Sequence, residues 1–188
     1  MDEVIEFVSD YDIDLLLIHE TCLQPGHEPK IPNFTLYKND RINYTNLRTT
    51  GGTCIYVKNS LNHHQLPTPQ MTGIEATIVN LQVTENTKIA FASTYCKHSA
   101  TFAINDLSKL LNIQPHVIVA GDFNAKHTSW HNTSNSARDI NLNKHIKNRS
   151  DTKIIAPTEY THLNTKNPAN NTIIVFALYK NIRFRLPQ

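Results

Sequence analysis

The sequence has few cysteines, little net charge and no long hydrophobic run. Its three cysteines, Cys22, Cys54 and Cys96, lie far apart without a C-x-x-C spacing. The spacing therefore indicates neither a disulfide framework nor a zinc site. Cys54 and Cys96 fall within apparent strands and are expected to be small core residues with reduced thiols, as in an intracellular protein.

The absence of a long apolar run also predicts a protein without a membrane span, a signal peptide or a membrane partner. The hydrophobic content of 39% is that of a soluble globular protein, and 188 residues suffice for one domain, expected over residues 1–188. The formal charge of +2 neither requires nor excludes nucleic acid, because a local basic patch can bind phosphates in a nearly neutral chain.

The stretch over residues 117–124 carries the strongest chemical signal. A short apolar run predicts a buried strand, and Gly121 ends it so that Asp122 and Asn124 project from the strand's edge. Alternation turns Phe123 the other way, into packing. A carboxylate and a carboxamide then share one volume, at the end of a strand where α/β folds place chemistry. Alternatively, Asp122 and Asn124 only close the strand as turn-forming residues.

Strand patterns dominate the rest of the chain. Helical spacing is confined to residues 1–11, 102–111 and, with weak amphipathicity, 134–148. Residues 63–70 have the polar, proline-bearing composition of a loop. Strands are expected over residues 13–18, 34–38, 53–57, 74–83, 88–95, 117–121, 154–156 and 173–179, and the fourth and fifth of these should form an antiparallel hairpin. Many strands and few helices favour an α+β fold of two packed sheets with outer helices over a doubly wound parallel sheet.

Two further polar residues are expected at strand ends. Glu20 follows the apolar run at residues 13–18, and Tyr95 ends the second strand of the hairpin. Tyr95 should share one face with Phe91 and Ser93. Taken singly, Glu20 could be a solvated strand-end carboxylate and Tyr95 an aromatic residue that closes a strand.

Six stretches of the chain form an ordered set: LLLIHET, GGTCIYVKNSL, IAFASTYC, VIVAGDFNAKHTSW, APTEYTHL and IIVFALYKNI. Read in this order, they resemble the endonuclease/exonuclease/phosphatase (DNase I-like) family, most closely the endonuclease domain of jockey-type non-LTR retrotransposons. The resemblance implies a four-layer sandwich, with two β-sheets face to face and helices outside, that cleaves phosphodiesters with Mg²⁺, which Mn²⁺ could replace. The implied partners are DNA and, in the full element, a reverse-transcriptase domain. The protein is expected to be monomeric, and nuclear if it functions.

The same resemblance assigns roles to four residues. Glu20 would bind the metal, since a hard divalent cation prefers carboxylate oxygen. Asp122 would orient and deprotonate the attacking water, and Asn124 would hold Asp122 and the phosphate in register. Tyr95 would present its phenol to the scissile phosphate and help to stabilise the developing charge.

Four more residues are candidates for DNA contact. Lys126, His127 and Trp130 follow Asn124 directly, where a cation and a ring could touch a phosphate or a sugar. Trp130 could equally be a loop anchor with a buried ring. Thr161 matches a position that approaches the DNA backbone in related nucleases, or is a threonine of a short strand.

The chain departs from the family pattern in three ways, and these departures argue against full nuclease activity. The chain begins after the opening strand that carries an Asn in family members, and it ends before their Ser-Asp-His segment. Val175 stands where an Asp is expected. The sandwich should therefore be incomplete at both ends, with an exposed sheet edge. We expect an impaired nuclease that nicks target DNA to prime reverse transcription. The alternatives are an inactive remnant that at most binds DNA, and a lipid or inositol phosphatase, against which the polar GDFNAKHTSW loop argues.

Overall fold

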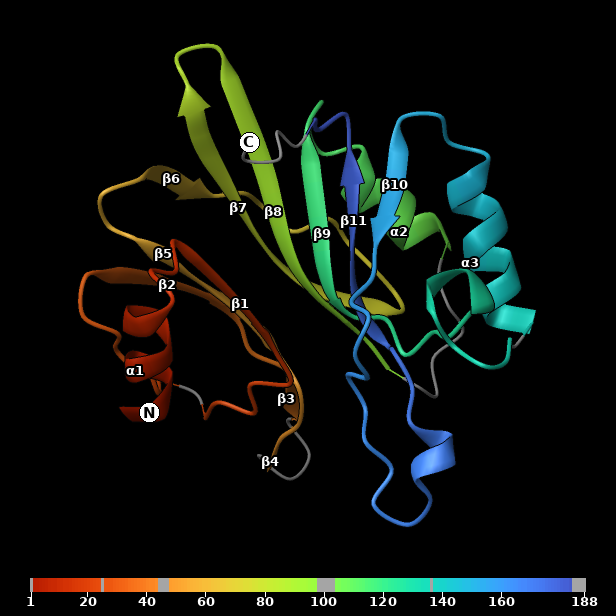
Figure 1. The fold of residues 1–188 in the computed structure, drawn as a ribbon. Coiled ribbons are helices and arrows are strands. Elements are labelled where there is room, and N and C mark those ends of the chain that lie inside the picture. Colours follow the sequence, from red (N-terminus) through yellow and green to blue (C-terminus); the bar gives the residue numbers. More distant parts are fainter. Residues whose placement is uncertain (1, 25, 44–47, 98–103, 136, 184–188) are drawn as a thin grey trace.

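Two β-sheets lie face to face, with helices on their outer faces (Figure 1). The computed structural model describes residues 2–24, 26–43, 48–97, 104–135 and 137–183. The larger sheet has the order β10-β11-β9-β8-β7-β6 and the smaller sheet the order β1-β5-β2. This arrangement confirms the two packed sheets with outer helices that the sequence predicted.

The elements have the following bounds. The larger sheet contains β6 (Asn62–Gln65), β7 (Ile74–Thr84), β8 (Thr87–Cys96), β9 (Val117–Asp122), β10 (Thr152–Ile155) and β11 (Val175–Lys180), and the smaller contains β1 (Leu15–His19), β2 (Phe34–Asn39) and β5 (Thr53–Lys58). A short pair consists of β3 (Ile42–Asn43) and β4 (Arg48–Thr49), and the helices are α1 (Asp2–Asp10), α2 (Ile104–Leu111), α3 (Ala137–Lys147) and the 3-10 turns Thr128–Trp130 and Pro168–Asn170. None of the helices in the described residues has the length and apolar character that a membrane crossing requires.

Alternation along the strands divides the apolar side chains among three clusters. Ile55 of β5 packs with Val79 of β7 between the two sheets. Its neighbour Tyr56 points the other way and packs with Val8 of α1. The largest cluster lies between the larger sheet and the helices α2 and α3, and it includes Leu107, Leu110, Val119, Leu142 and Phe176. Each layer is thus held to the next by buried apolar area, as in other layered domains.

Most predicted elements are present, with one correction. The antiparallel hairpin of β7 and β8 is confirmed, as are the three helices. The prediction of a loop over residues 63–70 is wrong for its first three residues, which belong to β6 and pair with β7. This edge strand is largely exposed and is held through its backbone, so it needs no alternation of apolar side chains and leaves no such signal in the sequence.

The parallel pairing of β8 with β9 aligns the ends of three strands. Tyr95 at the end of β8 is opposite Asp122 at the end of β9. Asp122 is in turn opposite Val175, at the start of the antiparallel strand β11. Opposed residues in a sheet point to the same face, so these three side chains lie in a row on the side of the smaller sheet.

A buried carboxylate fixes the crossover helix α2 to β7. Asp106 is 1% exposed. Its Oδ2 accepts hydrogen bonds from the backbone N–H groups of Thr72 (2.8 Å), Gly73 (2.7 Å) and Ile74 (3.3 Å). Burial opposes ionisation of Asp106, but these bonds and the nearby charge of Lys109 lower its pKa below the ordinary value.

Asp106→Asn is therefore expected to lower the free energy of unfolding at pH 7 by about 1–3 kcal/mol, because hydrogen bonds to a charged acceptor are stronger. The lowered pKa means that this contribution is complete above the ordinary value of 3.8 and disappears as the pH falls through the folded-state pKa. Urea unfolding at several pH values measures it. Asp10→Asn, at an exposed position of α1, is the control; equal losses in both variants at pH 7 would contradict the prediction.

Candidate active site

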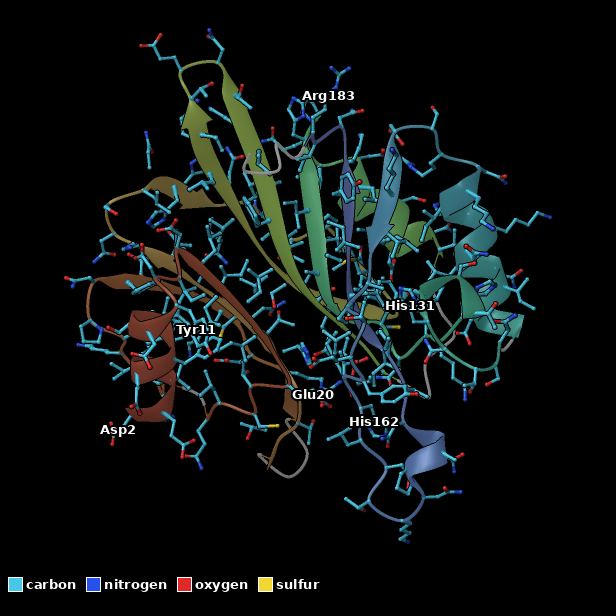
Figure 2. All side chains as sticks on the ribbon, viewed as in Figure 1. Asp2, Tyr11, Glu20, His131, His162 and Arg183 are labelled. Atoms are coloured by element: carbon cyan, nitrogen blue, oxygen red, sulfur yellow. The ribbon has the colours of Figure 1, made fainter. Side chains whose placement is uncertain are left out.

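A polar cavity of about 770 Å³ opens where β8 and β9 end. Its lining residues are Glu20, Tyr95, Asp122, Asn124, Lys126, Asp139, His162, Asn164, Asn170, Thr172 and Ile174. Figure 2 labels Glu20, at the end of the smaller sheet, and His162, on the loop between β10 and β11. The structure thus brings Glu20, Tyr95, Asp122 and Asn124 together from three distant stretches of the chain.

Local backbone geometry explains how Asp122 and Asn124 reach the cavity. Gly121 has φ +149°, and a Cβ there would lie 1.9 Å from the carbonyl oxygen of Thr94, so only glycine allows β9 to approach β8 this closely. Asn124 has φ +46°, which turns the chain back so that its N–H donates to Asp122 Oδ1 at 2.6 Å. The Asn124 side chain donates from Nδ2 to the carbonyl of Cys96 at 3.0 Å. Asn124 therefore orients the Asp122 carboxylate and ties it to the end of β8.

Tyr95 is a protonated hydrogen-bond donor beside two carboxylates. Burial raises the pKa of Tyr95, and a hydrogen bond with Glu20 and the negative charges of Glu20 and Asp122 raise it further. The Arg41 guanidinium opposes this shift; its carbon lies 5.8 Å from the ring centroid. The net pKa lies well above the ordinary value, so the phenol keeps its proton at neutral pH.

Asp122 is a carboxylate with a raised proton affinity. Burial raises the pKa of Asp122, and the charge of Glu20 raises it as well. The N–H of Asn124 and positive charge on His19 and His162 act in the opposite direction, but the net shift remains upward. His19 also stacks on the Tyr95 ring, with centroids 6.3 Å apart. A buried carboxylate with a raised pKa can accept a proton from a bound water.

The oxygen donors of the cavity fit a hard divalent cation. Glu20 is exposed and close enough to Asp122 to raise its pKa, and the Asn124 amide lies beside them. Among the residues that the structure describes, no group of three or more His, Cys, Asp or Glu side chains is arranged to hold a metal. Mg²⁺ keeps most of its waters and is commonly bound through one or two carboxylates. Carboxylate and amide oxygens of this kind are ligands that hard divalent cations accept.

Of the three predicted DNA-contact residues on the loop after Asn124, one lines the cavity and two are buried. Lys126 lines the cavity. His127 is 8% exposed; its Nδ1 accepts the N–H of Ser129 (3.0 Å), and its Nε2 lies 3.2 Å from Nδ2 of Asn143. Trp130 is 1% exposed and packs between His127 and Phe176. Of the two interpretations of Trp130, the structure therefore agrees with the loop anchor.

Thr161 and Val175 lie beside the cavity rather than in it. The Thr161 hydroxyl accepts the N–H groups of Ile174 (2.9 Å) and Val175 (3.1 Å) and so fixes the start of β11. Both Thr161 and Val175 line a second cavity of about 400 Å³, together with His19. An aliphatic side chain thus lies opposite Asp122, at the position where the resemblance predicted a carboxylate.

Several residues around the site were not predicted from the sequence, among them Asp139 and His162 in the cavity and His19 in the neighbouring cavity. His19 directly precedes Glu20, and His162 directly follows Thr161. That adjacency was the available signal, but alternation alone would have placed each histidine on the opposite face from its neighbour. Asp139 is buried on α3, where its weak amphipathic pattern gave no indication of a cavity.

Comparison with known proteins agrees with the geometry. A family model described as endonuclease-reverse transcriptase matches residues 89–182. The probable RNA-directed DNA polymerase from transposon X-element of Drosophila melanogaster is 30% identical over 185 residues, 97% of this chain and 20% of the relative. The RNA-directed DNA polymerase from mobile element jockey of the same species is 26% identical over 138 residues, 73% of this chain and 15% of the relative. The chain spans about a fifth or less of the length of these curated relatives.

Solved structures share the fold at low sequence identity. The endonuclease domain of TRAS1, a telomere-specific non-LTR retrotransposon, superimposes with a TM-score of 0.72 at 16% identity, covering 94% of this chain and 76% of that one. An AP endonuclease from Archaeoglobus fulgidus gives a TM-score of 0.57 at 12% identity, covering 94% and 80%. Because the family model matches half of the chain and a relative is 30% identical over 97% of it, the chain belongs to the endonuclease-reverse transcriptase family.

Proposed function

We propose that this chain is a Mg²⁺-dependent DNA endonuclease domain of a non-LTR retrotransposon, which nicks target DNA to supply the 3′-hydroxyl that primes reverse transcription. The observation that carries the proposal is the convergence of Glu20, Tyr95, Asp122 and Asn124 on one cavity. The family membership supports the nuclease chemistry, and the names of the relatives support a reverse-transcriptase domain in the full element.

The reaction is attack of water on phosphorus, with cleavage of the bond to the 3′ oxygen, which takes up a proton from solvent and becomes the 3′-hydroxyl. Asp122 accepts the proton of the attacking water, a role that its raised pKa favours. The bond from the Asn124 N–H fixes the direction of the Asp122 carboxylate. Tyr95 retains its proton and donates to a phosphate oxygen as negative charge develops. A divalent ion held through Glu20 would neutralise charge on the phosphate when bound.

A plasmid assay tests the proposal. Supercoiled plasmid incubated with the protein and Mg²⁺ should convert to the open circular form, and EDTA should prevent the conversion. The nick should carry a 3′-hydroxyl that a DNA polymerase can extend. Binding of the plasmid without any nicking in Mg²⁺ or Mn²⁺ would reject the proposal.

Glu20→Gln should raise the Mg²⁺ concentration needed for half-maximal nicking. Loss of an outer partner of a metal ligand costs roughly 10–100-fold in metal affinity, and loss of the ligand itself should cost at least as much. Titration of nicking against Mg²⁺ measures the shift. Glu85→Gln, in the exposed turn after β7, is the control and should leave the titration unchanged. An unchanged Mg²⁺ dependence in Glu20→Gln would remove Glu20 as the ligand.

One observation favours a second candidate function. Val175 lies opposite Asp122 and cannot accept or donate a hydrogen bond through its side chain. The second candidate is therefore a DNA-binding protein of the same fold without cleavage activity. The plasmid assay separates the two, because both bind the plasmid and only the first nicks it.

A further inference from the structure

The charges in the cavity suggest a role for a histidine that the mechanism above leaves unused. Three of the lining residues are carboxylic acids, Glu20, Asp122 and Asp139, whereas the basic side chains in the lining are Lys126 and His162. A phosphodiester that enters a cavity with this many carboxylates needs N–H donors to compensate its own charge. His162 is such a donor.

His162 is held firmly in place by the backbone around it. Its N–H donates to the carbonyl of Thr172 at 2.9 Å, and the Thr172 N–H donates back at 3.0 Å. The preceding Thr161 hydroxyl accepts the N–H groups of Ile174 and Val175. These bonds connect His162 and Thr161 to the residues at the start of β11, where the loop between β10 and β11 ends. A donor on a fixed segment loses little entropy when it binds, as electrostatic catalysis requires.

The His162 side chain lines the same cavity as Asp122, the proton acceptor of the proposed reaction. Positive charge on His162 favours the ionised form of Asp122. Figure 2 shows His162 on the loop of the larger sheet, whereas Lys126 belongs to the loop that follows β9. A phosphate seated beside Asp122 would therefore meet donors from two separate loops.

We propose that His162 is a further catalytic residue, whose imidazole N–H donates to a non-bridging oxygen of the scissile phosphate. This inference rests on the proposed endonuclease function. The hydrogen bond strengthens as charge builds on the phosphate oxygens, so it stabilises the transition state more than the bound substrate.

Nicking kinetics of His162→Gln and His162→Ala test the assignment. Both variants should lose about 10²-fold in kcat with a small change in KM, as when one charge-stabilising donor is removed. His162 is exposed, so their unfolding midpoints should match the wild type. His27→Gln, an exposed histidine outside the cavity, is the matched control and should nick at the wild-type rate. A kcat within twofold of wild type, or a loss confined to KM, would overturn the catalytic assignment.

A second measurement separates this inference from the proposed function. The side-chain NMR signals of His162, identified by their loss in His162→Gln, should shift when a short DNA duplex is added in EDTA, where no cleavage occurs. If the wild type nicks DNA but the His162 signals do not shift, the role of His162 is rejected and the endonuclease function is retained. A shift in a wild type that does not nick would reject the endonuclease and retain the phosphate contact. Absence of both would reject both.

Discussion

Asp122→Asn is expected to reduce nicking by about 10³-fold and, at the same time, to raise the unfolding temperature of the protein. The loss of activity follows because an amide cannot accept the proton of the attacking water. The gain in stability follows because the pKa of Asp122 is raised by burial and by Glu20. The folded state therefore holds the ionised carboxyl less favourably than the unfolded chain does. Asn keeps the acceptor for the Asn124 N–H and removes the charge.

The pH dependence of the stability gain has a defined direction. With a raised folded-state pKa, the contribution of Asp122 is fully favourable below the ordinary value of 3.8 and is lost as the pH rises through the folded-state pKa. The stability difference between Asp122→Asn and wild type should thus be largest at neutral pH and vanish in acid. Thermal unfolding at several pH values, together with plasmid nicking, measures both effects.

Asp106→Asn is the matched comparison for Asp122→Asn. Both aspartates are buried, but the pKa of Asp106 is lowered and that of Asp122 is raised. The same chemical change should therefore destabilise the protein at Asp106 and stabilise it at Asp122. Asp106→Asn should retain nicking in the fraction that is folded. Stability changes of the same sign in the two variants would contradict the electrostatic account of the cavity.

Trp130→Ala is expected to lower the free energy of unfolding by about 3–5 kcal/mol, as for other large aromatic residues removed from a core. Trp130 is 1% exposed, with its ring centroid 5.2 Å from that of Phe176. The loss would be a large part of the roughly 5–15 kcal/mol that stabilises a typical domain. Urea unfolding at pH 7 measures it, and Tyr160→Ala, at an exposed aromatic residue, should have little effect.

Trp130→Phe distinguishes packing from DNA contact. The indole Nε1 is buried without a hydrogen-bond partner, so phenylalanine loses ring volume but no hydrogen bond and should cost much less than alanine. A buried ring cannot stack on a base, so DNA affinity of the folded Trp130→Phe protein should equal that of wild type. Weaker DNA binding at unchanged stability would reject the loop anchor and restore the contact interpretation.

Local patterns in the sequence were sufficient for the core strands and for the direction of key side chains. The apolar run ending in Gly121 became β9, and Phe123 packs away from the cavity as alternation predicted, stacked on Phe176 with centroids 4.5 Å apart. Tyr95 pairs with Asp122 of β9, and its side chain lines the cavity together with that of Asp122, on the face that alternation predicted. These features depend on near neighbours in the chain, which a sequence displays directly.

Features that depend on distant parts of the chain were not predictable in the same way. The position of His162 depends on its bridge to Thr172 across the loop between β10 and β11, and no periodicity encodes such a loop path. The burial of Trp130 depends on packing against β11, whereas a tryptophan in a polar loop suits a core and a binding surface equally well. The polar strand β6 is specified by backbone pairing, which leaves no side-chain pattern.

The parallel pairing of β8 with β9 has a consequence for the order of folding. The hairpin of β7 and β8 closes through a turn of a few residues, whereas Tyr95 meets Asp122 only after the crossover through α2 has returned the chain to the sheet. Contacts between distant residues form slowly, since the entropy of a long loop is lost before the strands attract each other. We therefore expect the hairpin that carries Tyr95 to form before β9 brings Asp122 beside it.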